Sequence, residues 1–188
     1  MKIFDFMILV GSFCVIALGA IESSPEKQTK NLSGKTQEPK SVRELSFEIA
    51  PKYGIPLEVV QVILDKESSG GHKLDVVRFE PGQIDRARKI AKTTNPDQLR
   101  AYASSHCPWQ VMGWHMPLVG MSWADLYNAE TCVEMGSKIL ANCYSQAADK
   151  GSYQKTYQAF KCYNGSDAYA RDAMQRLSLI AIEKLLKS

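Results

Sequence analysis

Apolar residues recur at helical spacing along most of the chain after residue 41. Steps of three and four residues place side chains on one face of an α-helix, and glycine or proline marks where such a pattern ends or begins. By these signals we expect helices over 42–53, 56–68, 84–91, 97–103, 128–149, 153–162 and 167–185.

Two stretches do not follow the helical spacing. The segment VVRFEPG, residues 76–82, is alternating and β-branched and ends at Pro-Gly, which is typical of a short extended segment. Residues 104–122 are expected to form a loop with a single turn near Gln110. The predicted fold class is therefore mainly α, with one small β element.

The first 41 residues indicate export. Lys2 precedes an apolar run from Phe6 to Ile21 that ends in small residues, which is typical of a secretory signal peptide over residues 1–20. An uncleaved membrane anchor is the alternative, although the run is shorter than the roughly 20 residues that a span needs. Residues 21–41 contain few large apolar side chains and are expected to be a disordered linker, so the folded domain covers residues 42–188. We expect the protein in the periplasm or the extracellular space.

Composition and charge narrow the function. The chain has 188 residues, of which 45% are hydrophobic, and this is enough for one domain with a sizeable core. Its formal net charge of +3 is not concentrated in a basic stripe, so nucleic acid is not an expected partner. His72, His106 and His115 match no metal-binding spacing and are expected at the surface or in loops. We expect a monomer with no metal or other cofactor.

Beyond the apolar run, the chain has Cys107, Cys132, Cys143 and Cys162. An even number of cysteines in an exported protein suggests two disulfides, for which three connectivities exist. Cys132 and Cys143 fall on one predicted helix, roughly 16 Å apart at 1.5 Å per residue, and so should not pair with each other. Folding the next helix back brings Cys162 towards Cys143. We therefore expect the pairs Cys143–Cys162 and Cys107–Cys132.

Glu67 is the first candidate for chemistry, in the stretch LDKESSGGH of residues 64–72. Helical spacing places it on the apolar face, in the last turn of its helix. Burial and the negative end of the helix dipole both disfavour the charged carboxylate, and a raised pKa suits a general acid near neutral pH. The alternative is a glutamate at a helix end whose carboxylate simply reaches water.

Four segments, IPLEVVQVILDKESSGG, VVRFEPG, SSHCPWQVMG and CYNGSDAYA, occur in that order between residues 55 and 170. Together they resemble the soluble lytic transglycosylase domain of the lysozyme-like superfamily, in the form that has an RFEPG segment. The resemblance covers about residues 44–180. It implies a lysozyme-like helical domain that cleaves peptidoglycan between N-acetylmuramic acid and N-acetylglucosamine. It also implies that Glu67, followed by Ser68, is the single catalytic acid/base.

The resemblance implies further site residues. Residues 108–113 match the family's Gly-Leu-Met-Gln-like stretch, and Tyr163-Asn164 matches its Tyr-Asn pair, whereas Cys107 stands where the family usually has glycine. Glu80, in RFEPG, is expected either to support the site through Arg78 or to orient a water as the second carboxylate of a hydrolase. The other expected substrate-binding or supporting residues are Ser68, Ser105, Gln110, Met112, Tyr163 and Asn164. Trp109 is expected to stack on a sugar ring or to pack in the core.

Peptidoglycan glycan strands are the expected partner, and a cell-envelope machine is a further candidate. Two alternatives to a lytic transglycosylase stay open. One is a muramidase that hydrolyses the same bond on the same fold. The other is a module that binds the wall, or assists assembly of a secretion system, without catalysis.

Overall fold

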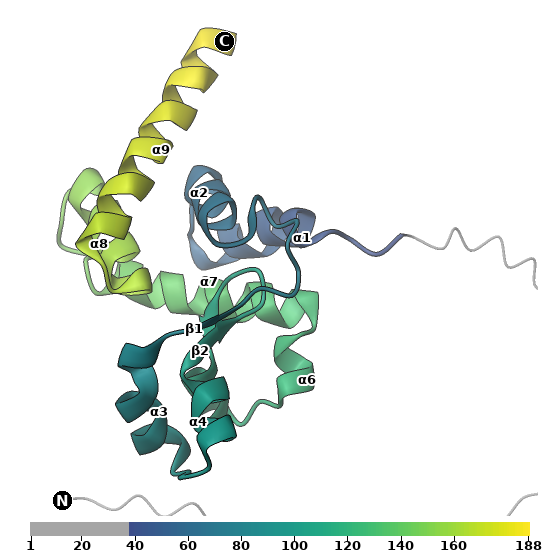
Figure 1. Cartoon of the computed structure of the whole chain (residues 1–188). Coiled ribbons are helices and arrows are strands. Elements are labelled where there is room, and N and C mark those ends of the chain that lie inside the picture. The colour runs from purple at the N-terminus through teal and green to yellow at the C-terminus, as the bar shows by residue number, and fades with distance from the viewer. Residues whose placement is uncertain (1–37) are drawn as a thin grey trace, which may run out of the picture. The chain divides into compact units, whose positions relative to one another are not determined.

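The computed structural model describes residues 38–188, which are mainly helical with a small antiparallel sheet, as the sequence predicts (Figure 1). The predicted signal peptide or anchor, and the linker through residue 37, lie outside the described residues. The helical elements are α1 (Val42–Ile49), η1 (Ala50–Tyr53), α2 (Leu57–Ser68), η2 (Pro81–Gln83), α3 (Ile84–Ala91), α4 (Pro96–Tyr102), η3 (Gly113–His115), α5 (Met116–Val119), α6 (Trp123–Leu126), α7 (Ala129–Ser145), α8 (Ser152–Asn164) and α9 (Asp167–Lys187). The strands are β1 (Val77–Phe79), β2 (Ser104–His106) and β3 (Val111–Met112).

Helix α7 crosses the middle of the fold, with α1 and α2 on one side of it and the sheet, α3 and α4 on the other (Figure 1). Its buried face includes Val133 and Leu140, which are fully buried in the main core. Trp109 also lies in this core and is wholly buried. Gly136 makes that possible, because a Cβ atom at this position would lie 2.5 Å from the Trp109 ring.

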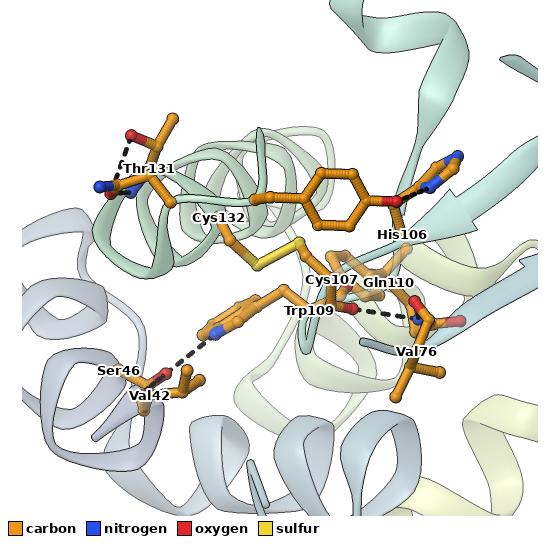
Figure 2. Close-up of a disulfide and its surroundings, with 12 residues drawn as sticks. Val42, Ser46, Val76, His106, Cys107, Trp109, Gln110, Thr131 and Cys132 are labelled. Carbon is orange, nitrogen blue, oxygen red and sulfur yellow. Dashed lines mark hydrogen bonds between the residues drawn. A yellow bond between two sulfur atoms is a disulfide. The ribbon is translucent and has the colours of Figure 1, made fainter. Parts of the chain in front are cut away.

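Two disulfides tie α7 to its neighbours, in the connectivity expected from the sequence. Cys107–Cys132 joins the β2–β3 connection to α7, and Cys143–Cys162 joins α7 to α8 (Figure 2 shows the first). The antiparallel return of α8 along α7 brings the second pair together, as the helix spacing predicts.

The prediction of a loop over residues 104–122 is wrong, although the single turn expected near Gln110 is present, with the Gln110 N–H donating to the Cys107 carbonyl at 2.9 Å. This stretch contains β2, β3, η3 and α5, and the strands form an antiparallel sheet in the order β1-β2-β3. Arg78 pairs with Ser105, and Ser105 pairs with Met112 on its other side. The three residues of β2 are all buried, so the strand shows no alternation of apolar and polar positions.

The first predicted helix is also corrected. It ends as an α-helix at Ile49 and continues as the 3₁₀ turn η1, because Pro51 has no backbone N–H to donate to the preceding turn. The buried positions are Val42, Ser46, Ile49 and Ala50, whereas Leu45 and Tyr53 are only partly buried. Within residues 38–188, none of the helices has the length and apolar character needed to cross a membrane.

His106 is not at the surface, in contrast to the expectation. It is buried in the sheet, where Nε2 lies 2.8 Å from the Ala101 carbonyl oxygen and Nδ1 lies 3.0 Å from the Tyr127 hydroxyl. Burial lowers its pKa. Both ring nitrogens therefore have partners in the neutral form, which makes His106 a structural residue. His72 is exposed as expected.

Candidate active site

A cleft of about 1000 Å³ contains most of the residues that the sequence singled out. One part of its lining comes from α3, η3 and α5, and another part comes from α7 and α8. The cleft is also lined by Glu67, Arg78, Glu80, Gln110 and Tyr169. The elements that meet here are far apart in the sequence, so only the folded chain forms the site. Among residues 38–188, no group of three or more His, Cys, Asp or Glu side chains is placed to hold a metal ion.

Glu67 lies in the last turn of α2, on the buried face that helical spacing assigns to it. The helix ends at Ser68, and the chain then turns away through Ser69, Gly70 and Gly71, which all have positive φ. Glycine adopts this conformation without strain, so the tail leaves the helix sharply. The Glu67 side chain is only 2% exposed and yet borders the cleft. This carboxyl group is therefore shielded from bulk water but accessible to a bound molecule.

Several neighbours act on the charge state of Glu67. Burial raises its pKa, while Tyr169 and Arg78 act in the opposite direction. The nearest Arg78 atom, Nη2, lies 3.7 Å from Oε2 of Glu67. The Tyr169 hydroxyl is buried without a hydrogen-bond partner within 3.5 Å among the described residues, yet it is near enough for each group to shift the pKa of the other. The net result is a raised pKa, as a general acid requires.

Glu80 is held by an ion pair. Its Oε1 atom accepts a hydrogen bond from Nε of Arg78 at 2.7 Å, and its backbone N–H donates to the Ala103 carbonyl at 3.0 Å. The same guanidinium faces Glu67, so Arg78 connects the two carboxylates. This is the supporting arrangement that the sequence offered as one role for Glu80.

Of the two roles expected for Gln110, its contacts fit the supporting one. Its side-chain Nε2 donates to the carbonyls of Val76 and Cys107, each at 3.0 Å (Figure 2). Its Oε1 accepts from the Ser105 hydroxyl at 2.7 Å. Both amide hydrogens are thus engaged within the protein. Gln110 borders the cleft as part of its frame, rather than as a free donor for a sugar.

Cys107 and Gln110 both have left-handed backbone conformations, with φ of 59° and 48°. Glycine adopts such values most easily, which agrees with the glycine that the resembled family has at the position of Cys107. Here the disulfide to Cys132 anchors the turn to α7 (Figure 2). A cysteine therefore occupies a left-handed position that suits glycine, and the disulfide connects it to α7.

The structure also places four other residues that the sequence singled out. Trp109 is a core residue whose indole N–H donates to Oγ of Ser46 at 2.9 Å (Figure 2), so it does not stack on a sugar. Ser68 is buried with its hydroxyl directed to the Leu64 carbonyl, 3.3 Å away, and it does not line the cleft. Ser105 and Met112 do line it.

The Tyr-Asn pair borders the cleft from the end of α8. Tyr163 donates its hydroxyl hydrogen to the Trp109 carbonyl. Burial is the main cause of the raised pKa of this phenol, and the charge of Glu67 is the second cause. Asn164 is exposed and does not cap α9, because Ser166 holds the capping position through the backbone N–H of Tyr169.

Sequence reasoning missed Tyr169 as a site residue. Its spacing with Ala173 and Leu177 indicates only the core-facing side of α9. Glu67 on α2 lies 102 residues earlier in the chain (169 − 67). No local pattern therefore distinguishes a tyrosine that packs in the core from one whose phenol faces this carboxylate.

Comparison of the chain with protein-family models, curated proteins and solved structures finds no match. The function is therefore inferred from the geometry of the cleft together with the resemblance of the four sequence segments.

Proposed function

We propose that the protein is a peptidoglycan lytic transglycosylase that cleaves the β-1,4 bond between N-acetylmuramic acid and N-acetylglucosamine. The observation that carries this proposal is Glu67, a carboxyl group that is 2% exposed, has a raised pKa and borders a cleft of about 1000 Å³. A cleft of that volume accommodates several sugar rings of a glycan strand.

In the proposed reaction, the Glu67 carboxyl donates its proton to the glycosidic oxygen while the bond from that oxygen to the anomeric carbon breaks. The resulting carboxylate then takes the proton of the 6-hydroxyl of the same muramic acid, and this oxygen bonds to the anomeric carbon. The products are a free 4-hydroxyl on the leaving sugar and a 1,6-anhydro end. Glu67 regains its proton, and no water is consumed.

The environment of Glu67 supports both halves of this cycle. Burial favours the protonated acid before bond cleavage, and Arg78, at 3.7 Å, stabilises the carboxylate that forms afterwards. The attacking hydroxyl is already part of the bound sugar, so its effective concentration exceeds that of water by orders of magnitude.

Hydrolysis by a muramidase is the second candidate, and one observation favours it. Glu80 borders the same cleft as Glu67, where a second carboxylate would orient an attacking water. Its ion pair with Arg78 at 2.7 Å favours the supporting role instead.

We also propose that the protein acts on the cell wall outside the cytoplasm, alone or within a cell-envelope machine. The disulfides Cys107–Cys132 and Cys143–Cys162 fit an oxidising compartment.

Lysis of purified sacculi, followed as loss of turbidity, tests the proposal. The wild-type protein is expected to clear the suspension, and Glu67→Gln is expected to be inactive. Asp65→Asn is a matched control, because Asp65 lies on the same helix but is exposed and pairs with Arg43 at 3.9 Å. Lysis by Glu67→Gln shows that the acid is another residue. A wild-type protein that binds sacculi without clearing them supports the non-catalytic alternative.

A further inference from the structure

Arg86 projects from α3 into the lining of the cleft, next to Trp114 and His115 of η3. Its guanidinium carbon lies 3.9 Å from the centre of the Trp114 ring, and the His115 ring stacks on the same indole with 3.8 Å between ring centres. Arg86 and His115 therefore both pack against the Trp114 indole.

This stack holds Arg86 in a defined place. Trp114 is only 7% exposed and so forms a fixed platform, whereas Arg86 itself is exposed. Stacking uses the flat face of the guanidinium and leaves its in-plane N–H groups free to form hydrogen bonds. Arg86 thus presents the N–H groups of its planar guanidinium to the cleft in a fixed position.

Among the arginine and lysine side chains of residues 38–188 that line the cleft, Arg86 alone has no carboxylate partner. Arg78 pairs with Glu80 at 2.7 Å, and Lys138 pairs with Glu134 at 3.3 Å. Within residues 38–188, Arg86 has no carboxylate within 4.0 Å, whereas Arg88 on the same helix pairs with Asp85 at 2.6 Å. Burial, assisted by Arg86, lowers the pKa of His115 to about 4, so His115 is neutral near pH 7. The positive charge of this part of the cleft therefore comes from Arg86.

We propose that Arg86 is a specificity-determining residue that binds a carboxylate of the glycan substrate through its guanidinium N–H groups. This inference rests on the proposed function and adds a preference for acidic over neutral glycans. An arginine fork and a carboxylate form parallel charge-assisted hydrogen bonds. A strand containing muramic acid offers carboxylates on its lactyl groups or on its attached peptides, whereas a chain of N-acetylglucosamine alone has none.

Binding measurements in the Glu67→Gln background test this, because that variant is expected to hold glycans without cutting them. Calorimetry would compare three ligands: soluble glycan strands with their peptides, strands stripped of peptides by an amidase, and neutral chitooligosaccharides. Adding Arg86→Gln is expected to lower the ratio of affinities for acidic over neutral glycans by about tenfold, the effect of one hydrogen bond to a charged group. Arg88→Gln is the matched control and should leave the ratio unchanged.

The ligands identify which carboxylate is bound. The peptide is amide-bonded to the lactyl group, so the lactyl carboxylate is free only in stripped strands, and a ratio that falls only for those strands assigns Arg86 to it. A ratio that falls only for peptide-bearing strands assigns Arg86 to a peptide carboxylate, and one that falls for both shows that it binds a carboxylate in either position. All three results support the proposal. An unchanged ratio in Arg86→Gln overturns it, even if the protein binds and cleaves glycans. Failure to bind any of the three glycans, in contrast, counts against the proposed function itself.

Discussion

The guanidinium of Arg78 on β1 lies 3.7 Å from the carboxylate of Glu67 on α2, measured from Nη2 to Oε2. This contact places a cation beside a carboxyl group whose burial favours the neutral form. Glu80 pairs with the same guanidinium and acts on Glu67 in the opposite direction. The protonation of Glu67 is therefore set mainly by burial, and Arg78 and Glu80 shift its pKa in opposite directions.

The pH dependence of activity tests how Arg78 and Glu80 shift the pKa of Glu67. The general acid must be protonated, so kcat/KM falls as pH rises through the pKa of Glu67. Arg78→Gln removes a group that lowers this pKa, so the high-pH limb of the profile should move to higher pH. Glu80→Gln removes a group that raises it, so the limb should move to lower pH, with a moderate loss of activity and an unchanged product. Shifts in the same direction, or none, contradict the assignment of the limb to Glu67.

Thermal stability should depend on pH through Glu67. Burial raises its pKa in the folded state above the unfolded value of about 4.5, so the group contributes stability below the unfolded pKa that is lost as pH rises through the folded pKa. Glu67→Gln removes this dependence. The Tm of the variant minus that of the wild type should therefore increase from pH 4 to pH 8, as measured by circular dichroism. A constant difference across this range would show that the carboxyl group is not destabilised by burial.

Packing of α7 against Trp109 predicts a clash at one glycine. A Cβ at Gly136 would lie 2.5 Å from the Trp109 ring, whereas nothing lies within 4 Å of a Cβ at Gly151. Gly136→Ala should lower the free energy of unfolding by about 1–3 kcal/mol through overpacking, and Gly151→Ala should lower it less, because it only replaces the N-cap glycine of α8. Urea denaturation measures both. Equal stabilities of the two variants contradict the close approach of Trp109 to α7.

Removal of the Cys143–Cys162 disulfide should destabilise the protein. The bridge closes a loop with a sequence separation of 19 residues, for which chain entropy gives about 3 kcal/mol. Denaturation of Cys143→Ala/Cys162→Ala measures this loss, and a peptide map under non-reducing conditions reads the connectivity. A bond between Cys132 and Cys143 contradicts the continuous helix α7 on which both residues lie.

Sequence reasoning succeeded where a local period determines a position. Helical spacing placed Glu67 on the buried face of its helix, and three turns between Cys132 and Cys143 excluded their pairing. It failed for β2 and β3, because strands of three and two residues are too short for a period to emerge. It failed for His106 because the burial of that residue depends on the sheet that β2 forms.

The side-chain roles in the site follow from contacts between distant segments, so local patterns do not reveal them. The amide of Gln110 is occupied by the Val76 carbonyl, 34 residues away, and the indole of Trp109 by Ser46, 63 residues away. The sequence identifies amide and aromatic groups of the kind that bind sugars. Only the folded chain shows which of them already have partners.

The nature of the new glycan end tests the central claim most directly. Purified sacculi would be digested with the wild-type protein, and the muropeptides would be weighed by mass spectrometry from the earliest time points, before and after reduction with borohydride. Intramolecular attack by the 6-hydroxyl produces 1,6-anhydromuramic ends, which are lighter by one water than hydrolysed ends and resist reduction. We predict that these ends dominate. Reducible muramic ends from the start would show that water is the nucleophile, and the protein would then be a muramidase.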